Sequence, residues 1–423
     1  MAKTTRFADS ARSRPGLVAA FFIDAVGSGM FLPFSLLFFL ATTSLPLTQI
    51  GLALSIAAVV RIPVTIAAGP LSDRFGPRAA IVTSQLLQAA GFTGYLFVHG
   101  FWALVAAAAL VQVGNSIFWV AYAPLIFAIA AEGEREHWFA LCTALRTAGL
   151  AAGGVIAGAT VALGGRPGFI GVAAANAASF VLAAFLSARL RPGTATPSTG
   201  SLSAGSWKPL LRDYPFLGFV AVNVGITFLA LAVPLALPVF LVKILGLPTW
   251  APGITLALNA TLVAASTPIV MWAISGRQRR HVLTVSQACM IVAFGVFLLV
   301  HLLTAGAAIA LVLIAIVPLA ACEVMQAAVV PSVVTESATP QTLGRYTSAY
   351  QVTFSIGDII VPAIVALALR AGAAALWLPL SAVALIDLVA VALLARRMTA
   401  LTQRVGQPPP LGACLSCRWT CPR

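Results

Sequence analysis

Six ionisable side chains stand inside long apolar stretches of this sequence, and these are the residues best suited to do chemistry. They are Asp24, Arg61, Arg146, Glu323, Asp358 and Asp387. Placing such a residue in a membrane helix costs about 2.5–3.5 kcal/mol on insertion scales, so its presence is a functional signal by default. A carboxylate can bind a proton when an arginine partner moves away and release it when the arginine returns. These residue types therefore indicate reversible proton binding.

The spacing of these residues predicts how they pair. A rise of about 1.5 Å per residue places four of them in one layer, roughly 10–15 Å from one membrane surface. The four are Asp24, Arg61, Arg146 and Glu323. Because the first two helices are antiparallel neighbours, we expect an Asp24–Arg61 ion pair, with Arg146 as its competitor or as the partner of Glu323. The alternative for Asp24 and Arg61 is a static ion pair that only holds helices together.

The elements that must hold these charges are membrane helices. The chain has 423 residues, of which 60% are hydrophobic and 9% charged, and its mean hydropathy is +1.01. A soluble domain of this length could not bury so much apolar surface, and apolar runs of about 20 residues recur along it. The sequence therefore predicts an all-α membrane protein with about 12 transmembrane helices. They are expected near residues 17–40, 49–71, 79–98, 102–130, 138–163, 168–188, 216–241, 249–275, 282–303, 306–333, 344–369 and 373–394.

Lysine and arginine are distributed unevenly between the two sides of these helices. One side carries most of them, and the other carries only Arg166, Lys243 and Arg370. The positive-inside rule then places both termini in the cytoplasm, for a multi-pass protein of the plasma (cytoplasmic) membrane. The first apolar run is too long for a cleavable signal. The net charge of +14 does not indicate nucleic acid, because no basic patch is interleaved with aromatic residues.

The chain divides into two similar halves. The hydrophilic stretch 189–213 is rich in Ser, Thr, Gly and Pro and is expected to be a cytoplasmic linker. It separates bundles of six helices at 1–188 and 214–398, and residues 399–423 form an expected cytoplasmic tail. The segment 272–277 resembles 69–74 at an offset of roughly 205 residues, as an internal duplication would produce.

The segment Gly69-Pro-Leu-Ser-Asp-Arg-Phe-Gly-Pro-Arg78 carries the most specific motif. It resembles the loop signature G-x-L-x-D-R-x-G-x-R of the major facilitator superfamily (MFS). The resemblance implies two pseudo-symmetric six-helix bundles and a conformational latch between them. In that latch Asp73 meets the start of the eleventh helix, and Gly69, Arg74, Gly76 and Arg78 shape the loop. The alternative is an ordinary basic hairpin between two membrane helices.

Two further signatures of proton-coupled members are partial. Gly149, Gly153 and Gly158 match an exporter motif of the fifth helix, G-x-x-x-G-P-x-x-G-G, but the motif's proline and one of its glycines are replaced. Generic close packing of helices is the alternative role of these glycines. In the fourth helix only Gly114 matches the motif R-x-x-Q-G, so another cation must replace its arginine.

The resemblance also assigns residues to a central cavity lined by helices one, four, seven and ten. It favours Asp24 and Glu323 as proton carriers, with Asp358 as a deeper alternative, whereas Asp387 is expected to have a structural partner. Polar and aromatic residues expected to bind cargo are Asn115, Trp119, Tyr122, Asn223, Gln326, Tyr350 and Gln351. Apolar walls with a few polar points suit an amphipathic, drug-like molecule. Contact with lipid is the alternative for each aromatic residue.

The sequence has no motif of an enzyme or an ATP-driven pump. It lacks a nucleotide-binding loop with its lysine, H-E-x-x-H and G-x-S-x-G. Cys414, Cys417 and Cys421 lack a fourth ligand nearby, so no metal or other cofactor is expected. We expect a monomeric secondary transporter that exports a small molecule in exchange for protons across the lipid bilayer. The alternatives are an importer of a sugar, organic acid or amino acid, and a transport-inactive sensor or lipid-handling protein.

Overall fold

The computed structural model describes residues 15–129, 135–189, 208–300, 302–303, 305–338 and 343–405. Within these residues the regular elements are helices, apart from one isolated bridge between Gln278 and Arg404. Helices satisfy every backbone group internally, as a chain surrounded by lipid must do. The predicted all-α class is confirmed. Most of the expected linker and the three tail cysteines (Cys414, Cys417 and Cys421) lie outside the described residues.

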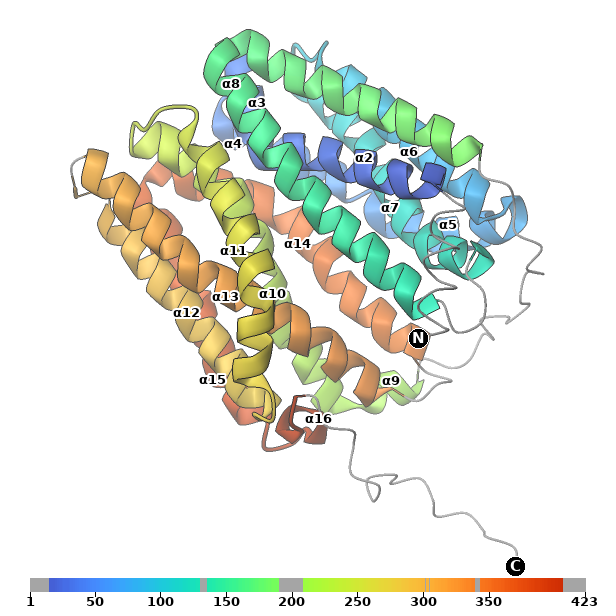
Figure 1. The fold of residues 1–423 in the computed structure, drawn as a ribbon, viewed down its shortest axis with the longest axis vertical. Coiled ribbons are helices and arrows are strands. Elements are labelled where there is room, and N and C mark those ends of the chain that lie inside the picture. The colour runs from blue at the N-terminus through green and yellow to red at the C-terminus, as the bar shows by residue number, and fades with distance from the viewer. Residues whose placement is uncertain are drawn as a thin grey trace, which may run out of the picture.

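The N-terminal half contains seven α-helices and one short 3-10 helix among the described residues. They are α2 (Pro15–Phe31), η1 (Leu32–Phe34), α3 (Ser35–Thr42), α4 (Leu47–Ala58), α5 (Arg61–Phe75), α6 (Pro77–Tyr95), α7 (Phe101–Ile129) and α8 (Arg135–Ala188). Pro33 interrupts the first pass at η1. Gly165 has φ 53° and ψ −128°, which glycine tolerates best, and α8 reverses its direction there (Figure 1).

The C-terminal half repeats this architecture. Its elements are α9 (Lys208–Arg212), α10 (Tyr214–Val239), η2 (Phe240–Ile244), α11 (Ala251–Ile274), α12 (Arg279–Val300), α13 (Ala305–Ser337), α14 (Leu343–Ala371), α15 (Ala373–Leu394) and α16 (Thr399–Thr402). Asp213 caps α10 by accepting a hydrogen bond of 3.1 Å from Phe216 N. Its other oxygen accepts one of 2.7 Å from the Tyr346 hydroxyl, which ties α10 to α14.

Ten helical stretches of the described chain are long and apolar enough to cross a membrane. One of them, Ala144–Ala188, contains the reversal at Gly165 and therefore makes two passes. α6 is not among the ten, but it has 19 residues and packs against α7 and α8. The described residues thus make twelve passes, in agreement with the predicted number.

The two halves each have an aromatic core. In the N-terminal half Phe92 stacks on Phe180 with ring centroids 5.4 Å apart. In the C-terminal half Trp377 packs against Phe297 at 4.8 Å and against Phe240 at 5.1 Å. Such pairs add about 0.5–1.5 kcal/mol each beyond the burial of their area.

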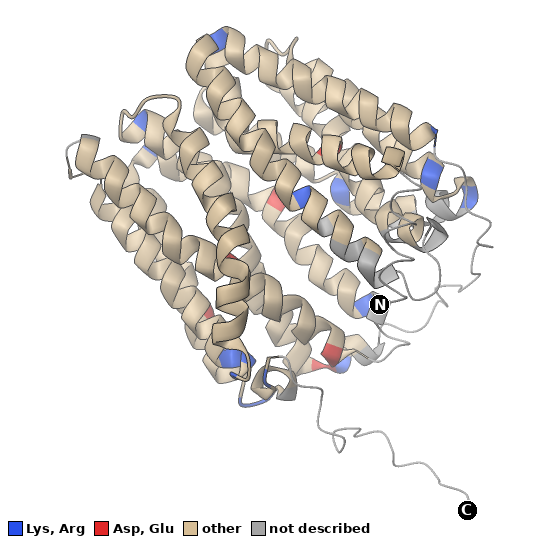
Figure 2. Ribbon diagram, viewed as in Figure 1, with Lys and Arg blue, Asp and Glu red and all other residues tan. Residues whose placement is uncertain are grey.

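The two ends of the molecule differ in charge. Most described arginines lie at one end, here called the arginine-rich end, and Figure 2 shows this concentration. They are Arg74, Arg78, Arg189, Arg212, Arg277, Arg279, Arg280, Arg345, Arg396, Arg397 and Arg404. The opposite, arginine-poor end carries Arg166, Lys243 and Arg370 among the described residues.

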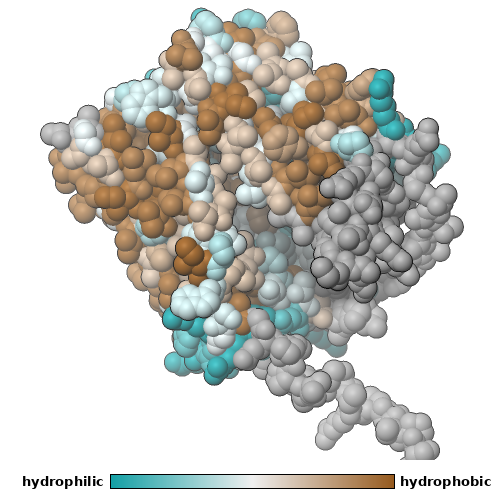
Figure 3. Space-filling view, viewed as in Figure 1, coloured by the Kyte–Doolittle hydropathy of each residue, from teal (hydrophilic) through white to brown (hydrophobic). Residues whose placement is uncertain are grey.

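The halves meet toward the arginine-poor end. There α4 packs against α14, and Ser55 Oγ accepts a hydrogen bond of 3.0 Å from Ala363 N. The first part of α8 packs against α11, where a Cβ added to Gly158 would lie 2.6 Å from the Cα of Gly253. Both contacts lie in the parts of these helices that are nearest the arginine-poor end. Figure 3 shows a recess between the halves on the face in view, bordered by apolar side chains.

Residues 399–405, which the sequence assigns to the tail, pack on the C-terminal half. Gly276 N donates to Val405 O at 3.0 Å, and Val405 N donates to Arg277 O at 2.9 Å. Arg279 is 4% exposed, and its guanidinium donates to Glu336 at 2.6 Å. It also donates to the Ala400 carbonyl at 3.2 Å and to Gln403 Oε1 at 3.1 Å, so one arginine joins α12, α13 and this segment.

Candidate functional site

The two halves are joined by an ion pair in the middle of the bundle. Arg61 begins α5, and its Nη1 donates to Asp358 Oδ2 of α14. The two side chains are 13% and 26% exposed. Arg61 is fourteen residues from Leu47 and fourteen from Phe75, so it lies about 20 Å from either end of its pass. Asp358 stands at a similar depth in α14, fifteen residues from its first residue.

The predicted Asp24–Arg61 pair is wrong. The second pass does not end near Leu71 but continues to Phe75, so Arg61 lies deeper than its sequence position implied. In addition, α4 packs against α14 and α7, whereas α2 packs against α8. Arg61 therefore reaches Asp358 rather than Asp24.

Asp24 has Arg146 as its electrostatic partner. The two groups interact, and Asp24 is 4% exposed. Glycine makes this possible, because α2 and α8 approach closely at Gly149, where an added Cβ would lie 2.6 Å from the Cβ of Ala25. Arg146 is one turn from Gly149 and Asp24 is adjacent to Ala25, so both charges lie at one level. Arg146 thus takes the place beside Asp24 that the sequence assigned to Arg61, and it does not compete with Arg61, which is bound to Asp358.

Aromatic side chains of α7 surround Arg146. Its guanidinium carbon lies 4.8 Å from the centroid of the Trp119 ring, in a cation–π arrangement. Trp119 is 39% exposed and packs edge-on against Tyr122, with centroids 5.7 Å apart. We call Asp24, Trp119, Tyr122 and Arg146 the Arg146 cluster. It offers one charge of each sign beside accessible aromatic surface.

Glu323 belongs to a separate polar contact in the C-terminal half. It lies on an exposed position of α13. Asn259 of α11 donates to its two carboxylate oxygens at 3.1 and 3.3 Å. The expected contact with Arg146 is not formed, because Arg146 is engaged by Asp24 and Trp119 in the other half.

The predicted cargo residues separate into accessible and buried groups. Asn115 and Tyr350 are half-buried and Gln351 is exposed. Asn223 is 1% exposed and donates to Thr353 Oγ1 at 2.8 Å, so its amide holds α10 against α14 and does not reach cargo in this conformation. Gln326 is also buried, at 8% exposure.

The loop that carries the proposed latch is a tight turn. Gly76 has φ 82°, a left-handed conformation that favours glycine, and Pro77 starts α6 directly after it. Arg74 is exposed, and its guanidinium carbon lies 5.5 Å from the ring centroid of Phe75. Arg78 is half-buried. The side chain of Asp73 and the surroundings of Gly69 lie outside the described part of the structure, so the latch contact stays a prediction.

The three glycines of the exporter-like motif do not share one neighbour. Gly149 and Gly153 face α2, and a Cβ on Gly153 would lie 2.7 Å from Met30 N. Gly158 faces Gly253 across the boundary of the halves. The same stripe of small residues therefore holds α8 to its own half and to the other one.

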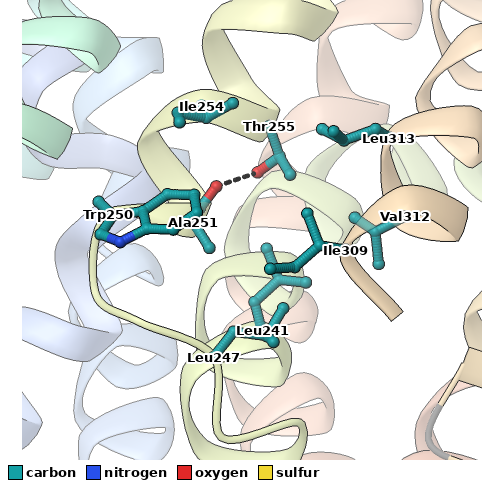
Figure 4. A pocket seen from close by; sticks show the side chains of 9 residues that line it. All are labelled: Leu241, Leu247, Trp250, Ala251, Ile254, Thr255, Ile309, Val312 and Leu313. Carbon is teal, nitrogen blue, oxygen red and sulfur yellow. Dashed lines mark hydrogen bonds between the residues drawn. The ribbon is translucent and has the colours of Figure 1, made fainter. Parts of the chain in front are cut away.

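One apolar pocket of about 270 Å³ lies near the arginine-poor end of the C-terminal half (Figure 4). Its wall includes Leu241, Trp250, Ile309 and Leu313, and its one hydroxyl belongs to Thr255. That hydroxyl donates to the carbonyls of Pro252 at 2.8 Å and Ala251 at 3.2 Å, so it offers no free donor. The pocket carries no ionisable group and is distinct from the charged pairs. Within the described residues, no three His, Cys, Asp or Glu side chains gather to hold a metal.

Twelve helical passes in two similar halves, with charges at their boundary, define a membrane transporter. The chain belongs to the Major Facilitator Superfamily, which it matches over residues 17–362. This is a family of transporters rather than of enzymes.

Curated relatives include the Multidrug resistance protein MdtH of Yersinia pestis (strain Pestoides F) and of Yersinia pseudotuberculosis (serotype IB, strain PB1/+). Each is 30% identical over 226 residues, or 53% of this chain. The match spans about half the length of these relatives, 55%.

Solved structures share the fold. A mutant of the nucleoside transporter NupG superposes with a TM-score of 0.73 at 13% identity, covering 92% of this chain and 100% of that one. A POT family transporter in complex with a thioalcohol-conjugated peptide gives 0.71 at 11% identity, with 92% and 97% covered.

Proposed function

We propose that this chain exports small amphipathic organic molecules in exchange for protons, with its arginine-rich end in the cytoplasm. Its similarity to the Yersinia multidrug resistance proteins favours export. The uneven distribution of arginine favours the orientation. The observation that carries the proposal is the Arg61–Asp358 pair, because a carboxylate able to bind a proton lies on the contact that joins the two halves.

The pair couples proton binding to the opening of the arginine-poor end. In the described conformation the ionised Asp358 holds Arg61, beside the other contacts between the halves. When the halves separate at that end with cargo bound, Asp358 becomes accessible from outside, and a proton that binds to it removes its charge and keeps Arg61 released. When they close again, the arginine stabilises the ionised carboxylate, and the same proton leaves toward the cytoplasm. Each cycle moves one proton inward, and no covalent bond of the cargo changes.

The Arg146 cluster is the proposed cargo site. Trp119 and Tyr122 supply aromatic surface, and Asp24 and Arg146 supply charges that a polar group of the cargo can contact. Asn115, Tyr350 and Gln351 add polar points, and Glu323 with Asn259 is a second carboxylate site in the C-terminal half. A mostly apolar wall with few polar groups selects for amphipathic cargo.

The loop from Gly69 to Arg78 is the proposed latch of the opposite state. A carboxylate at Asp73 ends α5, where it opposes the dipole of its own helix at a cost of about 0.3–1 kcal/mol. Contact with the first turn of α14, near Leu343, would instead be favourable. The latch would therefore form when the halves close at the arginine-rich end.

Inside-out vesicles with an acidified lumen test this function. Tetraphenylphosphonium is the first probe of a panel of lipophilic cations, and a pH-sensitive dye reports proton release. We expect the probe to dissipate the gradient with the wild-type chain, and Asp358→Asn to abolish the effect, whereas Asp358→Glu retains part of it. Unchanged flux in Asp358→Asn would overturn the coupling role. Greater sensitivity of expressing cells to the probes would indicate an importer, and no flux with any probe would indicate a sensor.

A further inference from the structure

A second buried carboxyl group lies in the C-terminal half, away from the charges described above. Asp387 of α15 is 4% exposed, and its Oδ2 has no hydrogen-bond partner among the described residues. It rests directly on the backbone of α10 at Gly225, where an added Cβ would lie 2.5 Å from Oδ2. The ion pairs among the described residues are Arg61–Asp358 and Arg279–Glu336. The structural partner expected for Asp387 is therefore not a cation in this part of the chain.

A second unpartnered polar side chain lies at the same level on α12. Gln287 is 0% exposed, and neither its Nε2 nor its Oε1 has a partner in the described structure. α12 and α15 run antiparallel and touch where Phe297 packs against Trp377. Gln287 lies ten residues from Phe297, and Asp387 lies ten residues from Trp377. At about 1.5 Å per residue, both are roughly 15 Å from that contact, in the same direction.

We propose that Asp387 is a proton-binding site whose neutral carboxylic acid pairs with the carboxamide of Gln287 between α15 and α12. In the described conformation the two side chains do not hydrogen-bond to each other. In the proposed pair the acid O–H donates to Gln287 Oε1 and the acid carbonyl accepts from Gln287 Nε2, so the unpartnered groups of both residues are satisfied. An ionised carboxylate only accepts, so it would leave Gln287 Oε1 unpaired and would itself be buried without a countercharge. The site is filled by one proton from water, which converts the carboxylate into the acid.

The neighbouring ionisable groups do not supply that countercharge. On α12, Arg279, Arg280 and His281 are six or more residues from Gln287, at least about 9 Å along the axis, and Cys289 is an uncharged thiol. On α10, the one ionisable residue is Tyr214, eleven residues before Gly225. On α14, Asp358 is engaged by Arg61, and the remaining ionisable groups lie toward its ends. These are Arg345, Tyr346, Tyr350 and Arg370.

The N-terminal half contains a similar arrangement without a charged residue. Ser84-Gln85 of α6 and Ser286-Gln287 of α12 each follow an arginine by six residues (Arg78 and Arg280). Gln85 lies seven residues before Phe92, and Ser187 lies seven residues after Phe180, on which Phe92 stacks, so Ser187 and Gln85 lie at about the same level. Ser187 is 2% exposed and uncharged. In the N-terminal half the buried side chain at the level of the corresponding glutamine is thus an uncharged hydroxyl.

Infrared difference spectroscopy of the full chain in lipid nanodiscs at neutral pH tests the proposal without any transport assay. When the infrared spectrum of Asp387→Asn is subtracted from that of the wild type, the difference should show the loss of one carbonyl band of a protonated carboxylic acid. Asp358→Asn is the matched control, because it removes an ionised carboxylate and should leave that band. Gln287→Leu keeps Asp387 but removes its partner, and should shift the band to higher frequency.

Two results would overturn the proposal. One is the loss of carboxylate bands, rather than an acid band, in Asp387→Asn. The other is an unshifted acid band in Gln287→Leu, which also decides the matter if Asp387→Asn fails to fold. Neither outcome depends on whether the chain exports cargo or exchanges it for protons, so this site and the proposed function fail separately.

Discussion

Arg61 and Asp358 are 297 positions apart in the chain, yet their side chains form an ion pair across the boundary of the two halves. Ser55 and Ala363 make the next contact along the same two antiparallel segments, with a hydrogen bond of 3.0 Å. The Ser55–Ala363 contact exists only while the halves are together at the arginine-poor end. A change of charge at Arg61 or Asp358 should therefore weaken this contact. This geometry makes the conformational state measurable through the neighbouring contact.

Loss of the ion pair should separate Ser55 from Ala363. A cysteine at each of these two positions, in a chain whose six native cysteines are replaced, should form a disulfide readily under mild oxidation. A hydrogen bond to a charged group contributes about 1.5–3 kcal/mol, so Asp358→Asn should reduce the population of the cross-linkable state about tenfold or more. The yield of disulfide over time, measured by mass spectrometry, checks this.

The charge exchange Arg61→Asp with Asp358→Arg is the control for that experiment. It restores opposite charges across the same boundary and should recover part of the cross-linking yield. Equal yields in the wild type and Asp358→Asn would show that the pair does not hold this state.

Gly158 should be far less tolerant of a side chain than Gly154. A Cβ on Gly158 would lie 2.6 Å from Gly253 Cα, and backbone cannot move aside there, whereas a Cβ on Gly154 meets Leu256 Cβ at 3.9 Å, an ordinary contact. Overpacking typically costs about 1–3 kcal/mol. Gly158→Ala should therefore lower the disulfide yield between positions 55 and 363, and Gly154→Ala should leave it unchanged. Equal effects of the two substitutions would refute close packing of α8 on α11.

The helical membrane class could be predicted from the sequence because it depends on local composition. Long apolar runs determine helices in lipid, and the turn at Gly76 follows from a glycine beside a proline. Even the reversal at Gly165 fell between two predicted helices. Such features involve residues close together in the chain.

The pairing of the charges could not be predicted in the same way. It depends on which helix faces stand opposite each other and on where α5 ends, four residues beyond the predicted limit near Leu71. Asn223 shows the same difficulty, since its burial against Thr353 arises from the packing of α10 on α14. The repeated Ser-Gln pair that contains Gln287 is visible in the sequence. That both glutamines are buried, however, is known only from the structure.

Arg146 should stabilise the N-terminal half through Asp24. Asp24 is 4% exposed and interacts electrostatically with Arg146, so loss of the arginine leaves a buried carboxylate without that positive charge, at a cost of about 1–3 kcal/mol or more. Arg146→Gln should therefore lower the unfolding temperature in detergent, and Asp24→Asn in the same chain should recover most of the loss. Thermal unfolding of the wild type, Arg146→Gln and the double variant measures this directly, and a double variant no more stable than Arg146→Gln would contradict the pairing.

Arg146→Lys separates packing on Trp119 from charge. It keeps the positive charge beside Asp24 but lacks the planar guanidinium that covers the ring at 4.8 Å. We expect near wild-type unfolding with weaker binding of tetraphenylphosphonium, measured by equilibrium dialysis. Unchanged binding would remove the Arg146 cluster as the cargo site.

Residues 399–405 should be part of the folded C-terminal half. A chain ending at Met398 loses the backbone hydrogen bonds of Val405 to Gly276 and Arg277, at 3.0 and 2.9 Å, and deprives Arg279 of two acceptors. Each hydrogen bond contributes about 0.5–1.5 kcal/mol net, and the buried guanidinium would keep only Glu336 among the partners described here. The unfolding temperature of the chain ending at Met398 should fall by several degrees, whereas a chain ending at Val405 should unfold like the full-length protein. Gln403→Ala in the full chain should give a smaller decrease. If the chain ending at Met398 unfolds at the same temperature as the one ending at Val405, the Arg279 contacts do not stabilise this end of the bundle.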